Sequence, residues 1–265
     1  MLRIGILISG SGTTAVSIIE AVRKGILKAQ IQVVISSRAD KSGVEKTKKL
    51  NLPTVVIDPR AFSSKADFAD KLLTTLKRFK VNFVSQNGWI PLTPPQVVVY
   101  FQGRIINQHP GPLDPGVGDD FGGKGMYGSR VTFSRLAYLL LTGEEPWTES
   151  STHYVATAYD QGDLLGVVKL KLNKFNFKPT LIDLLRKNSL QRFLIVETQE
   201  VQKKLLPIEH QNVINTLKVF AGSVADKNYI SNVKGFRRTK RLVPARCVPL
   251  LSEVKKLSIK LYPHG

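Results

Sequence analysis

The segment from residue 2 to residue 22 constrains the fold of this chain more than any other. Leu2–Ile8 is a nearly continuous apolar run, typical of a strand that is buried on both faces. Gly10, Ser11 and Gly12 follow as a turn, and Thr13 or Thr14 is placed to cap a helix. Apolar residues then recur at helical spacing. The chain therefore opens with a strand, a tight turn and a helix.

Short apolar segments alternate with amphipathic ones along the first half of the chain. The pattern predicts strands at residues 31–35, 54–57, 81–85 and 104–107, and helices at residues 43–50 and 65–79. Strands that alternate with helices indicate right-handed crossovers. The expected fold class is α/β, with a doubly wound, mostly parallel sheet. In such sheets ligands bind beyond the carboxyl ends of the strands.

The second half of the chain is less regular. Residues 150–158 and 164–171 resemble paired strands, and helices are expected at residues 129–141, 180–186 and about 199–220. The stretch 111–128 is rich in Gly, Pro and Asp and is expected to be a loop. Little periodicity is visible after Gly222. We therefore divide the chain into a main domain, residues 1–222, and a basic C-terminal extension, residues 223–265.

The charge of the chain points to anionic partners. The net charge is +19 over 265 residues, and residues 218–265 carry 11 basic and 2 acidic residues. Such an excess attracts nucleotides, phosphorylated metabolites, polyglutamylated folates or nucleic acids, although a solvated basic surface explains it equally. Cys247 is the only cysteine, and no signal peptide or membrane-spanning run is visible. We therefore expect a cytoplasmic protein.

The turn at residues 10–14 is a candidate phosphate site. It follows a strand and opens a helix, where backbone N–H groups and the helix dipole attract an anion. Its sequence also fits the loose dinucleotide pattern G-x-G-x-x-G/A. An NAD-binding enzyme would carry an acidic residue at the end of the second strand, where this chain has Arg38. Because an arginine could face the 2′-phosphate of NADP, NADP binding stays possible. A simple tight turn is the remaining alternative.

A second group of residues suits acyl transfer to an amine. Asn107 ends a predicted strand, and His109, two residues later, shares its side if the strand continues that far. Asp160 follows a later predicted strand. Asn107 can donate a hydrogen bond to an oxyanion without changing its charge. His109 can donate a second one and can relay a proton. Asp160 can orient His109, raise its pKa and accept the proton that leaves the amine.

Four motifs together resemble the folate-dependent glycinamide ribonucleotide formyltransferases. They are Leu7-Ile8-Ser9-Gly10-Ser11-Gly12-Thr13, Asn107-Gln108-His109-Pro110, His153 followed by Asp160-Gln161-Gly162, and Glu209-His210. The Asn-x-His-Pro motif with a distant Asp is the signature of the wider formyltransferase superfamily. The opening motif points to the glycinamide ribonucleotide branch, and the resemblance covers about residues 1–220.

This resemblance implies a reaction and a set of site residues. The formyl group would move from 10-formyltetrahydrofolate to the amine of glycinamide ribonucleotide, in purine biosynthesis and without a metal. Asn107, His109 and Asp160 would be catalytic. The N-terminal half of the main domain would bind the ribonucleotide, with Glu209 as a further contact. The C-terminal half would bind the folate and carry out the reaction. The implied ribonucleotide residues are Gly10, Ser11, Gly12, Thr13, Thr14 and Glu209, and the implied folate residues are Trp89, Ile90, Leu92 and His153.

The chain departs from the family pattern at several points, so other acceptors stay open. Thr14 and Pro91 replace an asparagine and a basic residue, and the stretch between His109 and His153 is longer than usual. Methionyl-tRNA or a sugar nucleotide could be the acceptor, and an NADP-binding or anion-binding module is the non-enzymatic alternative. Because only the basic tail favours RNA, we expect a chain that ends near Gly222 to keep formyl transfer if it folds.

Overall fold

A computed structural model describes residues 1–223 and 233–263 of the chain. Within these residues a seven-stranded sheet has the order β3-β2-β1-β4-β5-β6-β7. Neighbouring strands from β3 to β5 are parallel, and β6 and β7 are antiparallel to their neighbours. The strands are β1 (Leu2–Ile8), β2 (Ala29–Ser36), β3 (Thr54–Val56), β4 (Phe83–Asn87), β5 (Ile105–His109), β6 (Trp147–Tyr154) and β7 (Leu164–Lys171). The predicted doubly wound, mostly parallel sheet is confirmed.

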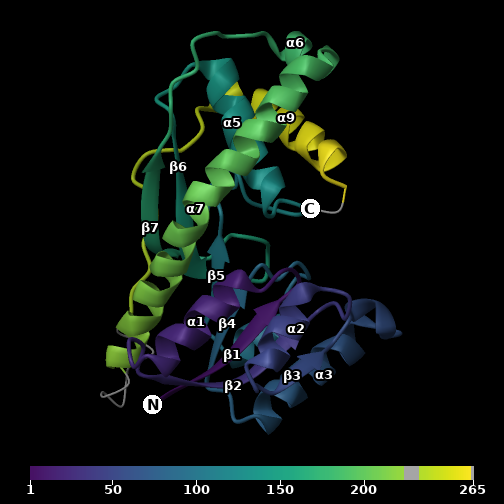
Figure 1. The fold of residues 1–265 in the computed structure, drawn as a ribbon, viewed down its shortest axis with the longest axis vertical. Coiled ribbons are helices and arrows are strands. Elements are labelled where there is room, and N and C mark those ends of the chain that lie inside the picture. Colours follow the sequence, from purple (N-terminus) through teal and green to yellow (C-terminus); the bar gives the residue numbers. More distant parts are fainter. Residues whose placement is uncertain (224–232, 264–265) are drawn as a thin grey trace.

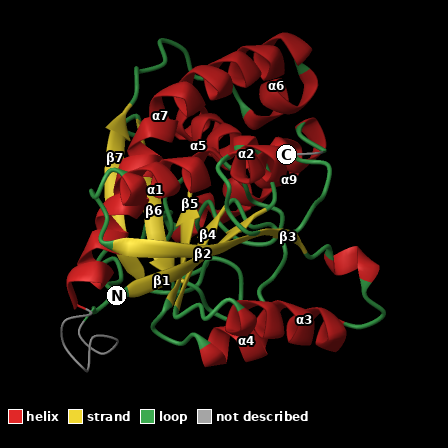
Figure 2. Cartoon of the chain, turned by 60° about the horizontal axis from the view of Figure 1, so that its bottom comes forward, coloured by secondary structure: helices red, strands yellow, loops and turns green. Residues whose placement is uncertain are grey.

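Helices cover both faces of this sheet (Figure 2). In Figure 1, α1 to α3 lie with β1 to β4 in the lower part, while α5, α6 and α9 lie in the upper part. The long helix α7 runs past both parts. The helices are α1 (Thr13–Arg23), α2 (Ser42–Lys49), α3 (Lys65–Arg78), α4 (Pro95–Tyr100), α5 (Ser129–Thr142), α6 (Leu181–Arg186), α7 (Asn188–Ser223) and α9 (Val248–Leu261).

The alternation of side chains along β1 explains why both faces are covered. Leu2, Ile4, Ile6 and Ile8 pack with residues of α1 and α7 on one face of the sheet. Leu7 packs on the other face, with residues of α3 and α4. Successive side chains of a strand point to opposite faces, so a strand that is apolar throughout needs a helical layer on each side.

The C-terminal segment differs most from the sequence prediction. Residues 223–265 show little periodicity as a sequence, yet α9 is a 14-residue helix. Its residues Leu251, Val254 and Leu257 are buried in one core cluster with α5 and α7. Phe236 also forms a bridge with Leu164 of β7. The segment therefore packs onto the rest of the structure through apolar side chains. Within the described residues, no helix is both long and apolar enough to span a membrane.

Two local details also differ from the prediction. Gly12, rather than Thr13 or Thr14, caps α1, with a left-handed backbone at φ 65°. This conformation suits glycine because it has no Cβ. The short helix α4 is not among the predicted elements; it begins at Pro95, and Pro94 precedes it as the capping residue. Proline favours the first turn of a helix but also marks loops, so the sequence alone leaves this segment ambiguous.

Candidate functional site

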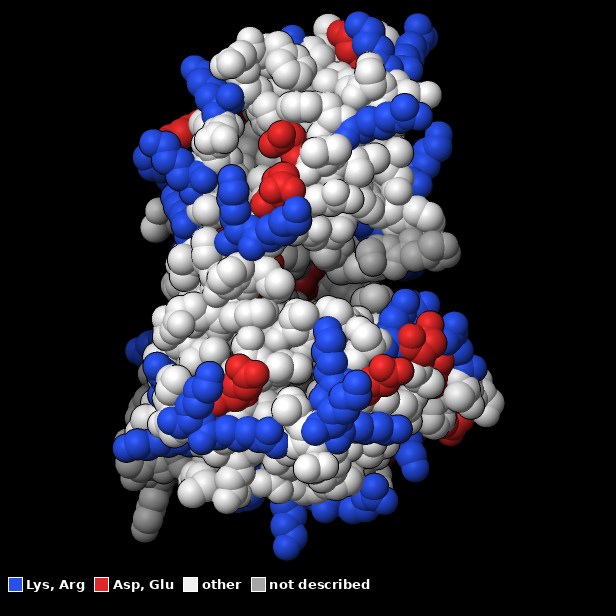
Figure 3. Space-filling view, in the orientation of Figure 1, with Lys and Arg blue, Asp and Glu red and all other residues white. Residues whose placement is uncertain are grey.

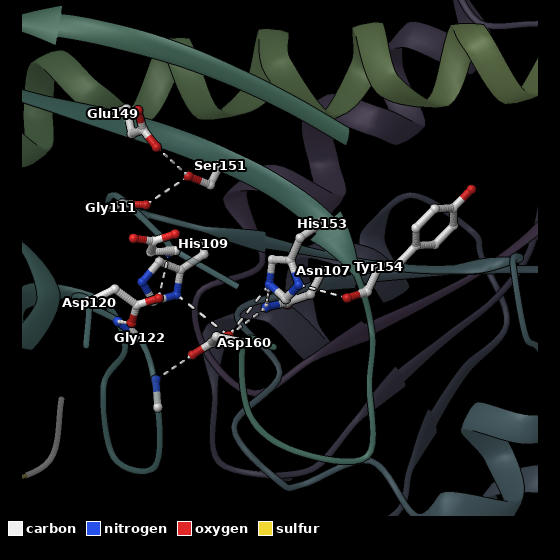
Figure 4. A network of polar contacts seen from close by, with 12 residues as sticks. Asn107, His109, Gly111, Asp120, Gly122, Glu149, Ser151, His153, Tyr154 and Asp160 are labelled. Atoms are coloured by element: carbon white, nitrogen blue, oxygen red, sulfur yellow. Dashed lines mark hydrogen bonds and ion pairs between the residues drawn. The ribbon is translucent and has the colours of Figure 1, made fainter. Parts of the chain in front are cut away.

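The candidate catalytic residues lie together at the carboxyl end of β5. Asn107 and His109 are two residues apart on this strand, so their side chains leave the same face. Antiparallel pairing places His153 of β6 opposite Asn107. Asp160 lies in the loop after β6 and has a left-handed backbone, with φ 56°. Figure 4 shows these four side chains close to one another.

Asp160 is the centre of this cluster. Its Oδ1 lies 3.5 Å from Nδ2 of Asn107, 3.8 Å from Nδ1 of His109 and 3.5 Å from Nε2 of His153. Its Oδ2 accepts a 2.8 Å hydrogen bond from the backbone N–H of Gly123. The side chains of His109 and Asp160 are only 3% and 9% exposed. The carboxylate is therefore held inside the protein by several partners.

Burial and neighbouring charges set the protonation states of the cluster. Burial alone would raise the pKa of Asp160, but His109, His153 and the Gly123 N–H lower it to about 2. Burial lowers the pKa of His109 and outweighs the opposite effect of Asp160. The expected upward shift of the His109 pKa is therefore wrong, because desolvation of the ring is the larger effect. At neutral pH the cluster combines a carboxylate with a neutral imidazole.

His153 holds the amide of Asn107. Its Nδ1 lies 2.8 Å from the carbonyl oxygen of Tyr154 and donates to it. With the ring proton on Nδ1, Nε2 accepts a hydrogen bond from Nδ2 of Asn107 at 3.1 Å. The second N–H of Asn107 makes only the 3.5 Å contact with Asp160. His153 therefore fixes the amide while it leaves one amide hydrogen with a long, weak contact.

The cluster opens into a cavity of about 800 Å³, which is within the range of small-molecule sites. Figure 3 shows a cleft between the lower and upper parts of the molecule. The lining of this cavity includes every residue that the formyltransferase resemblance implies for catalysis, ribonucleotide binding or folate binding. They are Gly10, Ser11, Gly12, Thr13, Thr14, Trp89, Ile90, Leu92, Asn107, His109, His153, Asp160 and Glu209. Arg38, the residue that kept NADP open, is not part of the lining.

The turn at residues 10–14 presents backbone donors to the cavity. No side chain in the described parts of the chain caps the N-terminus of α1, so the N–H groups of its first turn are free for a ligand. Lys46 of α2 reaches the same turn and donates to the carbonyl oxygen of Ser11 at 3.1 Å. Gly12 packs closely on Gly43, since a Cβ at Gly12 would lie 3.0 Å from the Gly43 Cα. The turn therefore combines free backbone N–H groups with one nearby cation, and it is closely packed on α2.

The segment after β4 forms an apolar wall. Trp89 is buried in the core beside the cavity, and Leu92 is 41% exposed. The backbone N–H of Ile90 donates to the hydroxyl of Ser9 at 2.9 Å, which ties this wall to the end of β1. The predicted folate segment and the predicted phosphate turn therefore lie on neighbouring strands, β4 and β1.

Glu209 of α7 is an acid in an unusually apolar position. It is 9% exposed. Burial raises the pKa of Glu209 to about 7, and the amide of Gln108 acts in the opposite direction. The carboxyl group therefore keeps its proton to a higher pH than an exposed glutamate, and it lines the same cavity as the phosphate turn.

The sequence analysis leaves several lining residues unnamed. Lys124, Arg130 and Lys203 bring positive charge to the lining, and Tyr159 adds a ring next to Asp160. Only Lys124 lies in the glycine-rich loop at 111–128, and no motif in the sequence marks the other three. Lys255 of α9 lies outside the lining but donates to the carbonyls of Asp120 and Gly122, which belong to the same loop.

Comparison with known proteins agrees with this arrangement. Residues 2–115 match the family model described as Formyl transferase. The chloroplastic phosphoribosylglycinamide formyltransferase of Vigna unguiculata is 28% identical over 163 residues, which are 62% of this chain and 49% of that protein. The phosphoribosylglycinamide formyltransferase of Haemophilus influenzae is 33% identical over 110 residues, 42% of this chain and 52% of that protein. The chain thus spans about half the length of these relatives.

Solved structures extend the similarity over most of the chain. Glycinamide ribonucleotide transformylase 1 from Symbiobacterium toebii is 25% identical, with a TM-score of 0.61 over 84% of this chain and 88% of that chain. The phosphoribosylglycinamide formyltransferase of Coxiella burnetii is 26% identical, with a TM-score of 0.63 over 83% and 87%. The sheet and its helices have the α/β formyltransferase fold, and the match to the formyl transferase family model covers residues 2–115.

Proposed function

We propose that the chain transfers a formyl group from 10-formyltetrahydrofolate to the amine of glycinamide ribonucleotide. The observation that carries this proposal is one cavity that joins the Asn107, His109 and Asp160 cluster to a phosphate-type turn at residues 10–14. The relatives that bear this activity in their names support the choice of acceptor.

The cluster supplies what the transfer needs. The acceptor amine attacks the formyl carbon, a new C–N bond forms, and the bond between that carbon and the folate nitrogen breaks. Asn107 donates its weakly engaged N–H to the oxyanion that develops on the formyl oxygen. Neutral His109 takes a proton from the attacking amine and returns it to the folate nitrogen that leaves. Asp160 stabilises the transient imidazolium from 3.8 Å.

The two substrates would occupy different strand ends. The ribonucleotide phosphate would accept hydrogen bonds from the backbone at Gly12, Thr13 and Thr14, with Lys46 nearby. Glu209, in its ionised form, would accept hydrogen bonds from the ribose hydroxyls. The pterin ring would pack against the apolar wall at Ile90 and Leu92, next to the cluster. In this arrangement the acceptor amine and the formyl carbon would meet at Asn107 and His109.

The basic tail gives little support to the alternative acceptor, methionyl-tRNA. Several arginines of this tail form ion pairs with acidic residues of the main domain. Arg237, Arg238 and Arg241 form ion pairs with Asp163, Glu149 and Asp119. Charges that are paired in this way contribute less to binding RNA phosphates than free ones.

A transfer assay tests the proposal. The full chain is incubated with 10-formyltetrahydrofolate and glycinamide ribonucleotide, methionyl-tRNA or a sugar nucleotide amine, and formylated product is measured for each. We expect turnover with glycinamide ribonucleotide and its loss in Asn107→Ala. Turnover with methionyl-tRNA alone would overturn the choice of acceptor. Calorimetric titration with NADPH tests the dinucleotide alternative. We expect no heat of binding, because the chain is proposed to bind a folate and a ribonucleotide.

A further inference from the structure

The loop at residues 111–128 is held by the C-terminal segment. Its acidic and carbonyl groups are bound by donors from residues 238–255, more than a hundred residues away in sequence. Leu242 N–H donates to Oδ2 of Asp114 at 2.8 Å, and Arg238 Nε donates to the Leu113 carbonyl at 2.6 Å. Lys255 Nζ donates to the carbonyls of Asp120 and Gly122, at 3.0 and 2.6 Å. The extra loop and the extra tail of this chain therefore form one unit.

Lys255 and Asp160 bind the two ends of the same peptide group. The Gly122 carbonyl and the Gly123 N–H belong to one planar unit, so fixing the oxygen fixes the direction of the N–H. Lys255 holds the oxygen at 2.6 Å, and the N–H donates to Oδ2 of Asp160 at 2.8 Å. A cation at the oxygen also polarises the peptide and strengthens the N–H as a donor.

The loop has little freedom to place this peptide elsewhere. A Cβ at Gly122 would lie 2.6 Å from Cδ2 of Leu113 and 2.8 Å from Cβ of Asp160. The Gly122 N–H donates to Oδ1 of Asp120 at 2.8 Å, which fixes the preceding peptide as well. Gly123 has a left-handed backbone, with φ 102°. The close approach of this peptide to Asp160 therefore requires glycine, and its orientation is set by Lys255 and Asp120.

Lys255 itself is an unusual cation. It is partly buried, and burial lowers its pKa. In the described parts of the chain its ammonium donates to two carbonyl oxygens. The neighbouring Lys256 is exposed and pairs with Glu253 at 2.7 Å on the surface. A partly buried lysine that donates to two loop carbonyls indicates that this cation helps to hold the conformation of the loop.

We propose that Lys255 is a positioning residue for Asp160, acting through the peptide between Gly122 and Gly123. This inference rests on the proposed function for what Asp160 then does, which is to orient and stabilise His109. Loss of Lys255 releases the oxygen end of this peptide, so the Gly123 N–H is aimed less firmly at Asp160. The shortest hydrogen bond of Asp160 then weakens, and its orientation toward His109 is held less tightly. The distant C-terminal helix is thereby part of the machinery for the transfer step.

The first test needs no substrate. The amide proton of Gly123 is followed by NMR in the full chain, in Lys255→Met and in the matched control Lys256→Met. We expect its signal to move upfield and its hydrogen exchange to accelerate at least about 10-fold in Lys255→Met, while the control stays as wild type. An unchanged Gly123 amide in Lys255→Met would overturn the proposal. If Lys255→Met does not fold, Lys255→Gln, which keeps one donor, is measured in the same way.

The second test separates positioning from general stabilisation. We expect Lys255→Met to lower kcat about 10- to 100-fold while the KM values of both substrates stay within about twofold. Lys255→Arg keeps the charge and the donors, so it should recover most of the rate. Equal losses in both variants, or a change confined to KM, would contradict a positioning role. If wild type transfers no formyl group, the proposed function fails, whereas the amide measurement still decides whether Lys255 holds the peptide.

Discussion

The Asn107 amide donates to Nε2 of His153 at 3.1 Å, while Nδ1 of His153 donates to the carbonyl of its own neighbour, Tyr154. This arrangement fixes both the tautomer of the ring and the direction of the amide. A catalytic amide that donates to an oxyanion must present its N–H in one orientation, because a misplaced donor loses most of its effect. His153 therefore supports Asn107 from the neighbouring strand.

His153→Phe tests this relationship. The variant keeps the ring and removes the nitrogen that accepts from Asn107, so the amide becomes free to rotate. We expect kcat to fall about 10- to 100-fold, with little change in the KM of the ribonucleotide. His153→Gln still offers an acceptor and should retain more activity than His153→Phe. A Phe variant with wild-type kcat would show that Asn107 needs no partner on β6.

His109 and Asp160 are expected to act as a unit. His109→Asn and Asp160→Asn should each lower kcat by about 10²- to 10⁴-fold, typical of general acid–base groups, with smaller effects on substrate binding. The double variant should be little worse than the worse single one, because each residue is useful only with the other. Steady-state kinetics of the three variants decide this, and fully additive losses would argue for independent roles.

Lys46 offers a cleaner test of the phosphate turn than Gly12. A substitution such as Gly12→Val would collide with Gly43 and disturb α2, so its effect would not report on the phosphate alone. Lys46→Met removes one charge beside the turn and should raise the KM of the ribonucleotide about 2- to 5-fold, as expected for an exposed ion pair. Lys48→Met, on the same helix, is the control. Equal KM values in the two variants would place the phosphate elsewhere.

The fold and the candidate site were predictable where the sequence follows simple periodicity. β1 and the turn at residues 10–14 are local features, and the carboxyl ends of adjacent parallel strands meet at one edge. These two facts bring the turn and Asn107 to one cavity. His109 follows from the same strand because two residues bring a side chain back to the same face.

The C-terminal contribution was harder to predict for two physical reasons. In α9 the apolar residues Leu251, Val254 and Leu257 do recur at helical spacing, but the charged residues among them, Glu253, Lys255 and Lys256, make the segment resemble a charged tail. Lys255 binds backbone carbonyls, and no residue type marks a carbonyl partner in a sequence. The role of the loop at residues 111–128 therefore emerges only when both segments are seen together.

Removal of residues 223–265 is expected to unfold the protein. Leu251, Val254 and Leu257 are buried against α5 and α7, and each buried side chain of this size contributes about 1.5–3 kcal/mol. Their combined loss is comparable with the whole stability of a typical domain, about 5–15 kcal/mol. A thermal melt followed by circular dichroism measures this. Lys240→Glu with Lys260→Glu, a control that changes only exposed charge, should melt near wild type. A truncated protein that is folded and active would show that residues 223–265 are not needed for the fold or for the reaction.

Glu209 predicts a pH dependence of ribonucleotide binding. Its pKa is raised to about 7 because the carboxyl group is buried, and only the ionised form accepts hydrogen bonds from both ribose hydroxyls. The KM of the ribonucleotide should therefore fall as the pH rises from about 6 to about 8. Ionisation of the phosphate and of the amine also varies over this range, so the comparison is made with Glu209→Gln, which shares those contributions and lacks the carboxyl titration.

The free energy of unfolding should fall as the pH rises, because the same carboxyl group then loses its proton. A carboxyl group whose pKa is higher in the folded than in the unfolded state binds its proton more tightly when folded. Its stabilising effect is complete below the unfolded pKa of 4.5 and is lost as the pH rises through about 7. Ionising Glu209 should therefore cost about 3 kcal/mol of unfolding free energy above that pH. We expect Glu209→Gln to melt higher than wild type at pH 8 and to show a much smaller difference at pH 5. A pH-independent difference between the two proteins would mean that Glu209 is not titrating in this range.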